Sequence, residues 1–321
     1  MNIIEIPAAK LNTKEFIQAQ CEQISKTVGD ATAITALSGG VDSSVVTALG
    51  HKALGKRLAA YFIENGLMRK DEPQAVVRAF RKLGIRVEVL DAKQAFFDAL
   101  RGLRDPEEKR EAITKTFYKD VFGALVKRSG ARFLLQGTIL TDVEETVAGV
   151  KRQHNVLAQL GIDPEEVYGY GVIEPVLQLR KDGVRKLARA LGLPAAVYQR
   201  MPFPGPALAA RVVGEASPER IELVRKATAI LEGELEKTKK FQCMAILHED
   251  RFPGMKKGKR EYGQQIEVRC WASVDARTAK PIWVAPRILE KLAARLTTEI
   301  PGVVSVTYNI ASKPPSTMEA V

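Results

Sequence analysis

The sequence predicts a doubly wound α/β domain with a parallel sheet, followed by a smaller α+β domain. From about residue 15 to 200, short apolar runs alternate with segments of helical period, which is typical of parallel strands joined by crossover helices. A proline-rich break at Met201–Pro206 then interrupts the pattern and is the best domain boundary. Beyond it, two helical and three strand-like segments predict the smaller domain.

The first half supplies helices and strands in turn. Ile17, Cys21, Ile24 and Val28 recur at helical spacing and predict a first helix. The predicted parallel strands are the apolar runs Ala33–Leu37, Leu58–Ile63, Val87–Leu90 and Phe133–Leu135. The predicted helices that accompany them are Val45–Leu54, Pro73–Leu83, Pro106–Val126 and Lys181–Leu191. Two of these helices begin with proline, which is favoured at the first helical position.

The second half is expected to form one α+β unit. Its predicted helices and strands are, in chain order, Pro218–Lys237, Gln242–Leu247, Gln265–Ala272, Pro286–Thr298 and Val303–Ile310. With 321 residues, of which 45% are hydrophobic, the chain is long enough to bury two cores. We therefore expect an N-terminal extension at 1–14, a first domain at 15–203 and a second domain at 204–321.

The segment SGGVDSS, residues 38–44, lies between the first predicted strand and the apolar helix after it. Gly39 and Gly40 let the backbone turn tightly and approach a ligand without a Cβ in the way. The N–H groups of such a loop and of a helix N-terminus form an anion site, and serine hydroxyls add donors. The residues expected to bind phosphate are Ser38, Gly39, Gly40, Val41, Asp42, Ser43 and Ser44. The alternative is an ordinary strand-to-helix turn.

The pattern around Asp42 distinguishes between classes of phosphate loop. The Walker pattern and its lysine are absent. The seven residues resemble the PP-loop of the ATP pyrophosphatases, which cleave ATP between the α and β phosphates and adenylate a substrate. The resemblance implies ATP and Mg²⁺ as cofactors, and Asp42 can either hold the Mg²⁺ or cap the helix.

A second polar segment follows the predicted strand Phe133–Leu135. Gly137 and Thr138 come directly after this strand, so we expect them at the same edge of the sheet as the loop and in contact with the nucleotide. Asp142 and Glu145 follow, and two carboxylates near a triphosphate suit Mg²⁺. The alternative for these two acids is a helix N-cap and a first-turn acid.

Two further segments carry candidate ligand-binding residues. A long non-periodic stretch at about 147–172 is of the kind that forms a lid, and its Lys151 and His154 would close over a leaving pyrophosphate. As a lone histidine, His154 is more often a surface residue. The segment 312–319 is stiffened by two prolines, and its Lys313 suits a phosphate; the alternative is a solvated tail.

Taken together, these segments resemble the ATP-pyrophosphatase part of the GMP synthetase family, from about residue 15 to 319. The residues that carry the resemblance are SGGVDSS at 38–44, GLMRK at 66–70, QGT at 136–138, HNV at 154–156, IEP at 173–175, PFPGP at 202–206, RVVGE at 211–215 and SKPPST at 312–317. The lid departs from the family pattern at Gln153, the loop after PFPGP at Ala207, and the stretch 258–262 lacks an expected aspartate.

The resemblance implies a reaction in two steps. XMP is adenylated by ATP·Mg²⁺ with release of pyrophosphate, and ammonia then displaces AMP to give GMP. The resemblance assigns catalytic roles to Asp42, Lys151 and His154, and XMP binding to Arg69, Lys313, Thr317 and Glu319. It also implies a separate glutamine amidotransferase subunit as the source of ammonia, and a homodimer formed through the second domain.

Composition narrows the remaining function classes. The net charge of +11 fits either nucleic acid or small polyphosphate ligands. The lysines are scattered without an aromatic-rich RNA-binding motif, which favours polyphosphates, so we expect no nucleic-acid partner. Cys21, Cys243 and Cys270 form no C-x-x-C pair and predict reduced thiols in a cytoplasmic protein. No apolar run reaches the length of about 20 residues that spans a bilayer, so we expect no membrane association.

Three alternatives to the GMP synthetase hypothesis stay open at this point. The first is a divergent PP-loop ligase or amidotransferase that adenylates another carbonyl-bearing metabolite. The second is a tRNA-modifying PP-loop enzyme, although the chain lacks the thiolate pairs or RNA-binding appendage that this would need. The third is a non-catalytic nucleotide-binding subunit, against which the intact Ser38–Ser44 loop argues.

Overall fold

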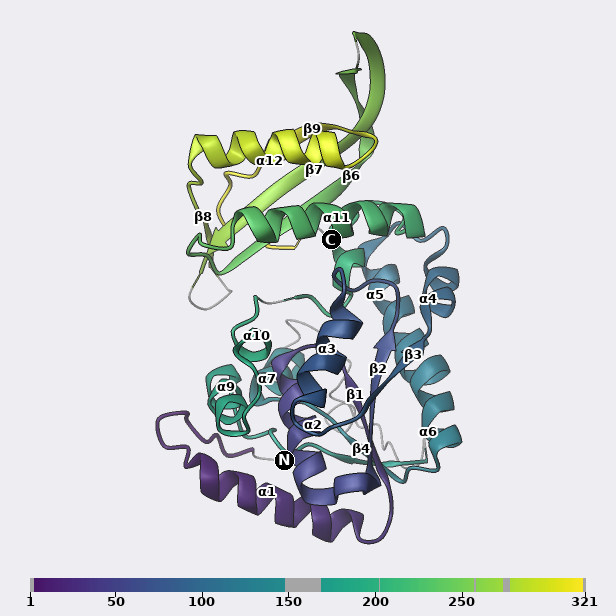
Figure 1. The fold of residues 1–321 in the computed structure, drawn as a ribbon, viewed down its shortest axis with the longest axis vertical. Coiled ribbons are helices and arrows are strands. Elements are labelled where there is room, and N and C mark those ends of the chain that lie inside the picture. The colour runs from purple at the N-terminus through teal and green to yellow at the C-terminus, as the bar shows by residue number, and fades with distance from the viewer. Residues whose placement is uncertain (1–2, 148–168, 202, 257, 274–277, 320–321) are drawn as a thin grey trace. The chain divides into compact units, whose positions relative to one another are not determined.

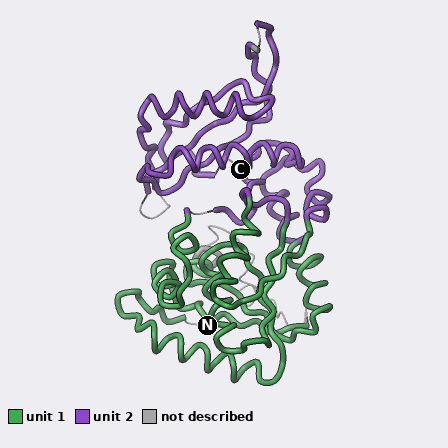
Figure 2. The backbone as a smooth tube through the Cα atoms, in the orientation of Figure 1, with its two compact units in different colours: residues 1–64, 71–92, 117–200 green, residues 65–70, 93–116, 201–321 purple. Residues whose placement is uncertain are grey.

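The computed structural model describes residues 3–147, 169–201, 203–256, 258–273 and 278–319. The chain forms two compact units, each built from segments that are separate in the sequence (Figure 2). Unit 1 comprises residues 1–64, 71–92 and 117–200. Unit 2 comprises residues 65–70, 93–116 and 201–321, so two short segments of the first half of the chain belong to it.

Unit 1 is built on a parallel sheet. Its strands are β1 (Ala33–Leu37), β2 (Leu58–Glu64), β3 (Val87–Asp91), β4 (Phe133–Leu135) and β5 (Gly171–Ile173). They follow the order β3-β2-β1-β4-β5, and every neighbouring pair is parallel. The predicted doubly wound α/β class is therefore confirmed. The sequence did not reveal β5, because it begins with a glycine, a residue depleted in strands, and its first two residues were assigned to the lid expected at about 147–172.

Helices cover both faces of this sheet (Figure 1). They are α1 (Thr13–Val28), α2 (Val41–Leu54), α3 (Glu72–Arg81), α6 (Gly123–Ser129), α7 (Leu140–Val147), α9 (Lys181–Ala190) and α10 (Ala195–Tyr198). The Asn12 side chain caps α1 by accepting two backbone N–H bonds. Helices α1, α2 and α9 pack against one another, and Figure 1 shows α9 and α6 on opposite sides of the sheet.

The predicted helix Pro106–Val126 is interrupted. The structure has α5 (Pro106–Lys115), then a π-helical stretch at Thr116–Phe122, and then α6. Helical residues run through the whole segment, so its type was predicted correctly. A π-helical stretch arises from a shift in backbone pairing and leaves no mark in the spacing of apolar residues. It also coincides with the passage of the chain from unit 2 to unit 1 between residues 116 and 117.

Unit 2 contains a small mixed sheet with two helices on it. Its elements are α4 (Lys93–Leu100), α5, α11 (Pro218–Glu234), β6 (Gln242–Lys256), β7 (Lys259–Ala272), β8 (Lys280–Pro281), α12 (Pro286–Glu299) and β9 (Val303–Tyr308). Strand β7 pairs with β6 and β8 antiparallel and with β9 in parallel. Helix α11 packs on β6 and α12 on β9, and the two helices contact each other (Figure 1).

The β6–β7 hairpin is longer than the sequence predicts. The apolar runs end at Leu247 and begin again only at Ile266, but cross-strand pairing continues outward through Arg251 and Gln264 to the tip at Lys256 and Lys259. In the outer part of the hairpin the large apolar residues (Phe252, Met255 and Tyr262) are scattered among polar and charged ones, so an apolar pattern could not reveal it. None of the helices within the described residues is long and apolar enough to cross a membrane.

Candidate active site

The Ser38–Ser44 loop connects β1 to α2 at the carboxyl edge of the unit 1 sheet. Strand order reverses between β1 and β4, and ligands of open α/β sheets bind at such a switch point. Gly40 is the N-cap of α2 and makes no side-chain cap bond. The first N–H groups of the helix therefore face the space in front of the loop, where the helix dipole favours an anion.

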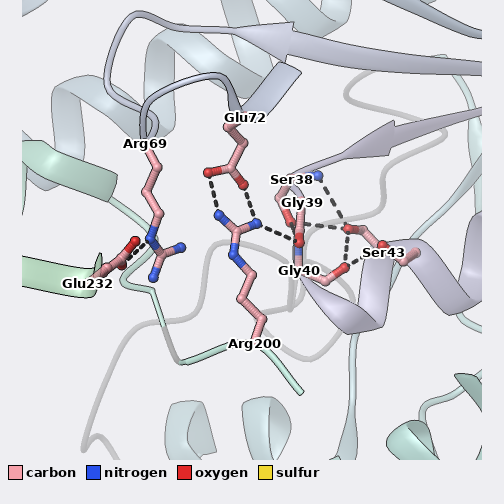
Figure 3. Close-up of polar contacts among 9 residues, drawn as sticks. Ser38, Gly39, Gly40, Ser43, Arg69, Glu72, Arg200 and Glu232 are labelled. Atoms are coloured by element: carbon pink, nitrogen blue, oxygen red, sulfur yellow. Dashed lines mark hydrogen bonds and ion pairs between the residues drawn. The ribbon is translucent and has the colours of Figure 1, made fainter. Parts of the chain in front are cut away.

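Serine hydroxyls hold the loop in shape (Figure 3). The Ser43 Oγ lies 3.1 Å from the Ser38 Oγ, accepts the Ser38 N–H at 3.2 Å and donates to the Gly40 carbonyl at 3.2 Å. The Ser44 hydroxyl donates to the same carbonyl at 2.7 Å. Ser44 is buried, whereas Ser43 is only half-buried. The Ser44 hydroxyl thus lies in the interior of the first turn of α2, whereas Ser43 is partly exposed beside it.

The segment after β4 approaches the loop closely. A Cβ placed on Gly137 would lie 2.9 Å from both the Asp42 carbonyl carbon and the Ser43 nitrogen. Only glycine allows this contact between two backbones. The Thr138 side chain is fully buried and accepts a hydrogen bond from the Gln136 amide at 3.1 Å. Gly137 and Thr138 thus lie at the switch point, with Gly137 against the loop and Thr138 in the interior.

Asp42 presents one engaged and one orphaned carboxylate oxygen. Its Oδ2 forms an ion pair with Lys181, whose Nζ lies 2.5 Å away. Its Oδ1 is buried and has no hydrogen-bond partner among the described residues. Sequence reasoning missed Lys181, although a lysine at the first residue of a helix opposes the helix dipole and could have been noticed for that reason.

The other candidate metal ligands are described only in part. The Asp142 Oδ2 accepts the Ile139 N–H at 3.1 Å, which resembles the reach-back bond of a capping box. Glu145 belongs to α7, and its side chain lies outside the described part of the structure. Lys151 and His154 also lie outside the described residues. No group of three or more potential metal-binding side chains occurs within the part of the chain that is described.

Unit 2 gathers a second set of charged side chains around Phe203. The Arg69 Nε donates to the Glu232 carboxylate at 2.7 Å (Figure 3). The Arg69 guanidinium lies 3.9 Å from the centre of the Phe203 ring. The Arg211 guanidinium lies 4.8 Å from the same ring centre and is fully buried. None of its three nitrogens has a hydrogen-bond partner among the described residues. Burial lowers the pKa of Arg211 to about 10, and the nearby Glu319 opposes that shift.

Lys109 holds the chain that follows Arg211. Its buried Nζ donates to the carbonyls of Val212 at 2.8 Å and Gly214 at 3.0 Å. Burial lowers the pKa of Lys109 to about 8, and the charge of Arg220 acts in the same direction. A lysine on α5, in the first half of the chain, therefore fixes the backbone on which Arg211 is carried.

The C-terminal segment is bound to the unit 2 sheet. Glu319 accepts a hydrogen bond from the Gln242 amide at 3.0 Å, and the Thr317 carbonyl accepts one from Arg269 at 3.1 Å. Lys313 pairs through its backbone with Ala279. The buried Met318 packs into a cluster made of Met244, Ile246, Trp271 and Ala279. The residues predicted to bind the second substrate thus all belong to unit 2, and Glu319 lies near Arg211.

Glu267 orients the arginine that holds this segment. Its carboxylate accepts hydrogen bonds from the Arg269 Nε at 2.7 Å and from the Asn309 amide at 3.0 Å, and the His248 Nε2 lies 2.8 Å away. Burial by itself raises the pKa of Glu267, but the hydrogen bonds from these three side chains outweigh it and lower the pKa to about 2. Glu267 is therefore charged near neutral pH.

Known proteins of one family match both units of the chain. A subunit of the glutamine-hydrolysing GMP synthase of Pyrococcus furiosus is 45% identical over 309 residues, which are 95% of this chain and 97% of that protein. The chain belongs to this family of GMP synthase subunits. The corresponding GMP synthase subunit of Methanocaldococcus jannaschii is 43% identical over 95% of this chain and 98% of that protein. A structure of NMN synthetase from Francisella tularensis is 18% identical, with a TM-score of 0.47 over 61% of this chain and 78% of that one.

Two family models match successive parts of the chain. Residues 13–209 match the NAD synthase family, and residues 230–320 match the GMP synthase C-terminal domain. The predicted resemblance to GMP synthetase is thereby confirmed, as are the predictions of a ligase and of ATP use. Arg211 and Lys181 are two of the residues near the candidate sites to which the sequence analysis gave no role.

Proposed function

We propose that the chain catalyses the ATP-dependent amination of XMP to GMP. ATP transfers its adenylyl group to the C2 oxygen of XMP and releases pyrophosphate; ammonia then attacks C2 and displaces AMP. The oxygen is a poor leaving group by itself and a good one as AMP. The observation that carries this proposal is the intact PP-loop at the switch point of a chain 45% identical to a GMP synthase subunit.

Within this proposal, the Ser38–Ser44 loop holds the ATP phosphates through backbone N–H groups and the Ser43 hydroxyl. The orphaned Asp42 Oδ1 fits a Mg²⁺ ligand, because a buried carboxylate oxygen without a donor is otherwise costly. Asp142 and Glu145 would supply the remaining carboxylates. The bound Mg²⁺ would neutralise phosphate charge, and Lys181 would add a cation beside Asp42. Lys151 and His154 remain candidates for contact with pyrophosphate.

The acceptor nucleotide is assigned to unit 2. Arg69, Lys313, Thr317 and Glu319 would bind XMP, and the fixed C-terminal segment supports this by holding Glu319 near Arg211. The Arg211 guanidinium lies on the same phenyl ring as that of Arg69 and has no hydrogen-bond partner among the described residues, which suits an anionic ligand. The relatives are named as one subunit of a glutamine-hydrolysing enzyme, which supports a separate glutaminase subunit as the source of ammonia. We also propose a homodimer formed through unit 2.

The proposal is tested by supplying purified protein with ATP, Mg²⁺, XMP and ammonium and measuring GMP and pyrophosphate. We expect one pyrophosphate per GMP, and loss of both products in Asp42→Ala. The control is Arg295→Lys in α12, whose ion pair with Glu299 lies on the surface of unit 2. XMP-independent turnover, or ATP binding without pyrophosphate release, would instead support a PP-loop ligase with a different acceptor.

A further inference from the structure

An ion pair between a buried carboxylate and a half-buried arginine lies directly against the PP-loop. Glu72, in the first turn of α3, has a side chain that is only 2% exposed. The Arg200 Nη2 donates to its Oε2 at 2.5 Å and the Arg200 Nη1 donates to its Oε1, so the pair is bidentate (Figure 3). Both residues belong to unit 1, and Arg200 is the last residue of that unit. Neither residue is part of the SGGVDSS motif.

The same arginine also binds the loop backbone. Its Nη1 donates to the Gly39 carbonyl at 3.1 Å. Gly39 has a φ of +76°, and a Cβ placed there would lie 2.2 Å from the Glu72 Oε1 and 3.0 Å from the Arg200 Nη1. The ion pair therefore occupies the space that any side chain at this position would need. Glycine is therefore needed at position 39 for two reasons: the backbone turn and the close contact with the ion pair.

Fixing the Gly39 carbonyl also fixes a donor on the opposite side. In a trans peptide the C=O of one residue and the N–H of the next point in opposite directions. With the Gly39 carbonyl held by Arg200, the N–H of Gly40 points away from the ion pair and donates a hydrogen bond to the Ser38 Oγ at 3.3 Å. Gly40 is the N-cap of α2, so this N–H belongs to the set of donors in front of the helix.

Stability alone is a weak reason for an ion pair whose carboxylate is buried and whose arginine is half-buried. Desolvation of two charges offsets most of their attraction, and apolar replacements of similar size are often neutral or stabilising. A role in holding the shape of the loop is better supported, because the third hydrogen bond of Arg200 goes to the Gly39 carbonyl, at the bend of the phosphate loop. The five donors of a guanidinium make it possible to hold a carboxylate and a carbonyl at once, which a lysine cannot do in the same geometry.

We propose that Glu72 and Arg200 are positioning residues for the PP-loop. Glu72 fixes the guanidinium of Arg200, and Arg200 fixes the Gly39–Gly40 peptide plane, so that the Gly40 N–H and the Ser38 hydroxyl bonded to it are held in place for a phosphate oxygen before the ligand binds. The inference rests on the proposed function only in taking that phosphate to be part of ATP. Preorganised donors of this kind avoid the cost of reorientation on binding.

The test compares three variants in ATP-site binding and in turnover. Arg200→Lys keeps the positive charge but loses the paired donors of the guanidinium. The double variant Glu72→Met/Arg200→Met replaces the ion pair with apolar side chains. The matched control is Arg295→Lys, which removes a bidentate arginine contact on the surface of unit 2. Binding is measured by calorimetry with the non-hydrolysable analogue AMPCPP and Mg²⁺, at a temperature well below the melting temperature of each variant.

Both active-site variants are expected to bind AMPCPP more weakly by roughly tenfold, the factor that loss of one charge-assisted hydrogen bond supplies. The KM for ATP should rise in parallel, while the KM for XMP should stay within about twofold of the wild-type value. General destabilisation of the protein would not change one KM and spare the other. The control should match wild type. Wild-type affinity for AMPCPP in Arg200→Lys, or an equal rise in both KM values, overturns the proposal. Since binding is measured without XMP, a wrong acceptor assignment would appear as missing turnover in the wild type and leave this test intact.

Discussion

Replacing Gly137 with alanine tests how closely two backbones must approach at the switch point. The added Cβ would lie 2.9 Å from two backbone atoms of the PP-loop, at Asp42 and Ser43. Carbon atoms in contact prefer about 3.5–4.0 Å, so the loop must retreat by roughly half an ångström or more. Gly137 does not have a positive φ, so alanine introduces no backbone strain of its own and the effect is purely one of space.

The size of the effect follows from this displacement. Overpacking of a well-packed site costs about 1–3 kcal/mol, which corresponds to a fall in melting temperature of about 2–12 °C for a domain of about 150–250 residues, the size range of unit 1. A displacement approaching 1 Å in a positioned site costs up to about 100-fold in rate. We therefore expect kcat/KM for ATP to fall by roughly 10–100-fold, measured by pyrophosphate release at saturating XMP.

The matched control is Gly233→Ala, in the helix α11. A Cβ at Gly233 would meet nothing within 4 Å, and alanine in a helix is favoured over glycine by about 0.5–1 kcal/mol. This variant should be at least as stable as wild type and equally active. If Gly137→Ala kept the wild-type kcat/KM and melting temperature, the close contact between the two loops, and with it the geometry of the site, would be wrong.

Three further outcomes follow from charged side chains. Lys181→Met removes the cation beside Asp42, so the KM for ATP should rise by roughly 3–10-fold; an unchanged KM would exclude a role at the phosphates. Glu267 has its pKa lowered to about 2, so its contribution of about 3 kcal/mol is complete above pH 4.5 and is lost as the pH falls toward 2; the stability difference from Glu267→Gln should shrink over that range. Burial lowers the pKa of Lys109 to about 8 from 10.5. The stability of wild type relative to Lys109→Met should therefore rise by about 3 kcal/mol between pH 8 and 10.5. A stability difference that does not change with pH would contradict the lowered pKa of Lys109.

Local patterns predicted the elements that build the phosphate site. The run Ala33–Leu37, the glycines after it and the helix behind them are contiguous, so one motif contained strand, loop and helix together. Gly137 could be predicted because the carboxyl ends of parallel strands meet at one edge. Its close approach to Asp42 could not, because the distance between two loops depends on the register of β1 with β4.

The rest of the site depends on pairings between distant residues. Lys181 lies 139 positions from Asp42, and Arg200 lies 128 positions from Glu72. Charged residues are common on helices, and the position of a lysine or arginine in the sequence does not indicate which carboxylate it pairs with. The inclusion of residues 93–116 in unit 2 has the same origin, since Lys109 binds a carbonyl 103 positions away. Burial and contact, not propensity, determine these features.

The most direct test of the account follows the fate of the acceptor oxygen. XMP labelled with ¹⁸O at C2 is incubated with ATP, Mg²⁺, ammonium and the enzyme, and AMP, pyrophosphate and GMP are analysed by mass spectrometry. Adenylation of XMP predicts one ¹⁸O atom in AMP for each GMP formed, and none in pyrophosphate. Unlabelled AMP, or label in the pyrophosphate, would contradict attack of the XMP oxygen on the α phosphate and with it the function proposed for the PP-loop.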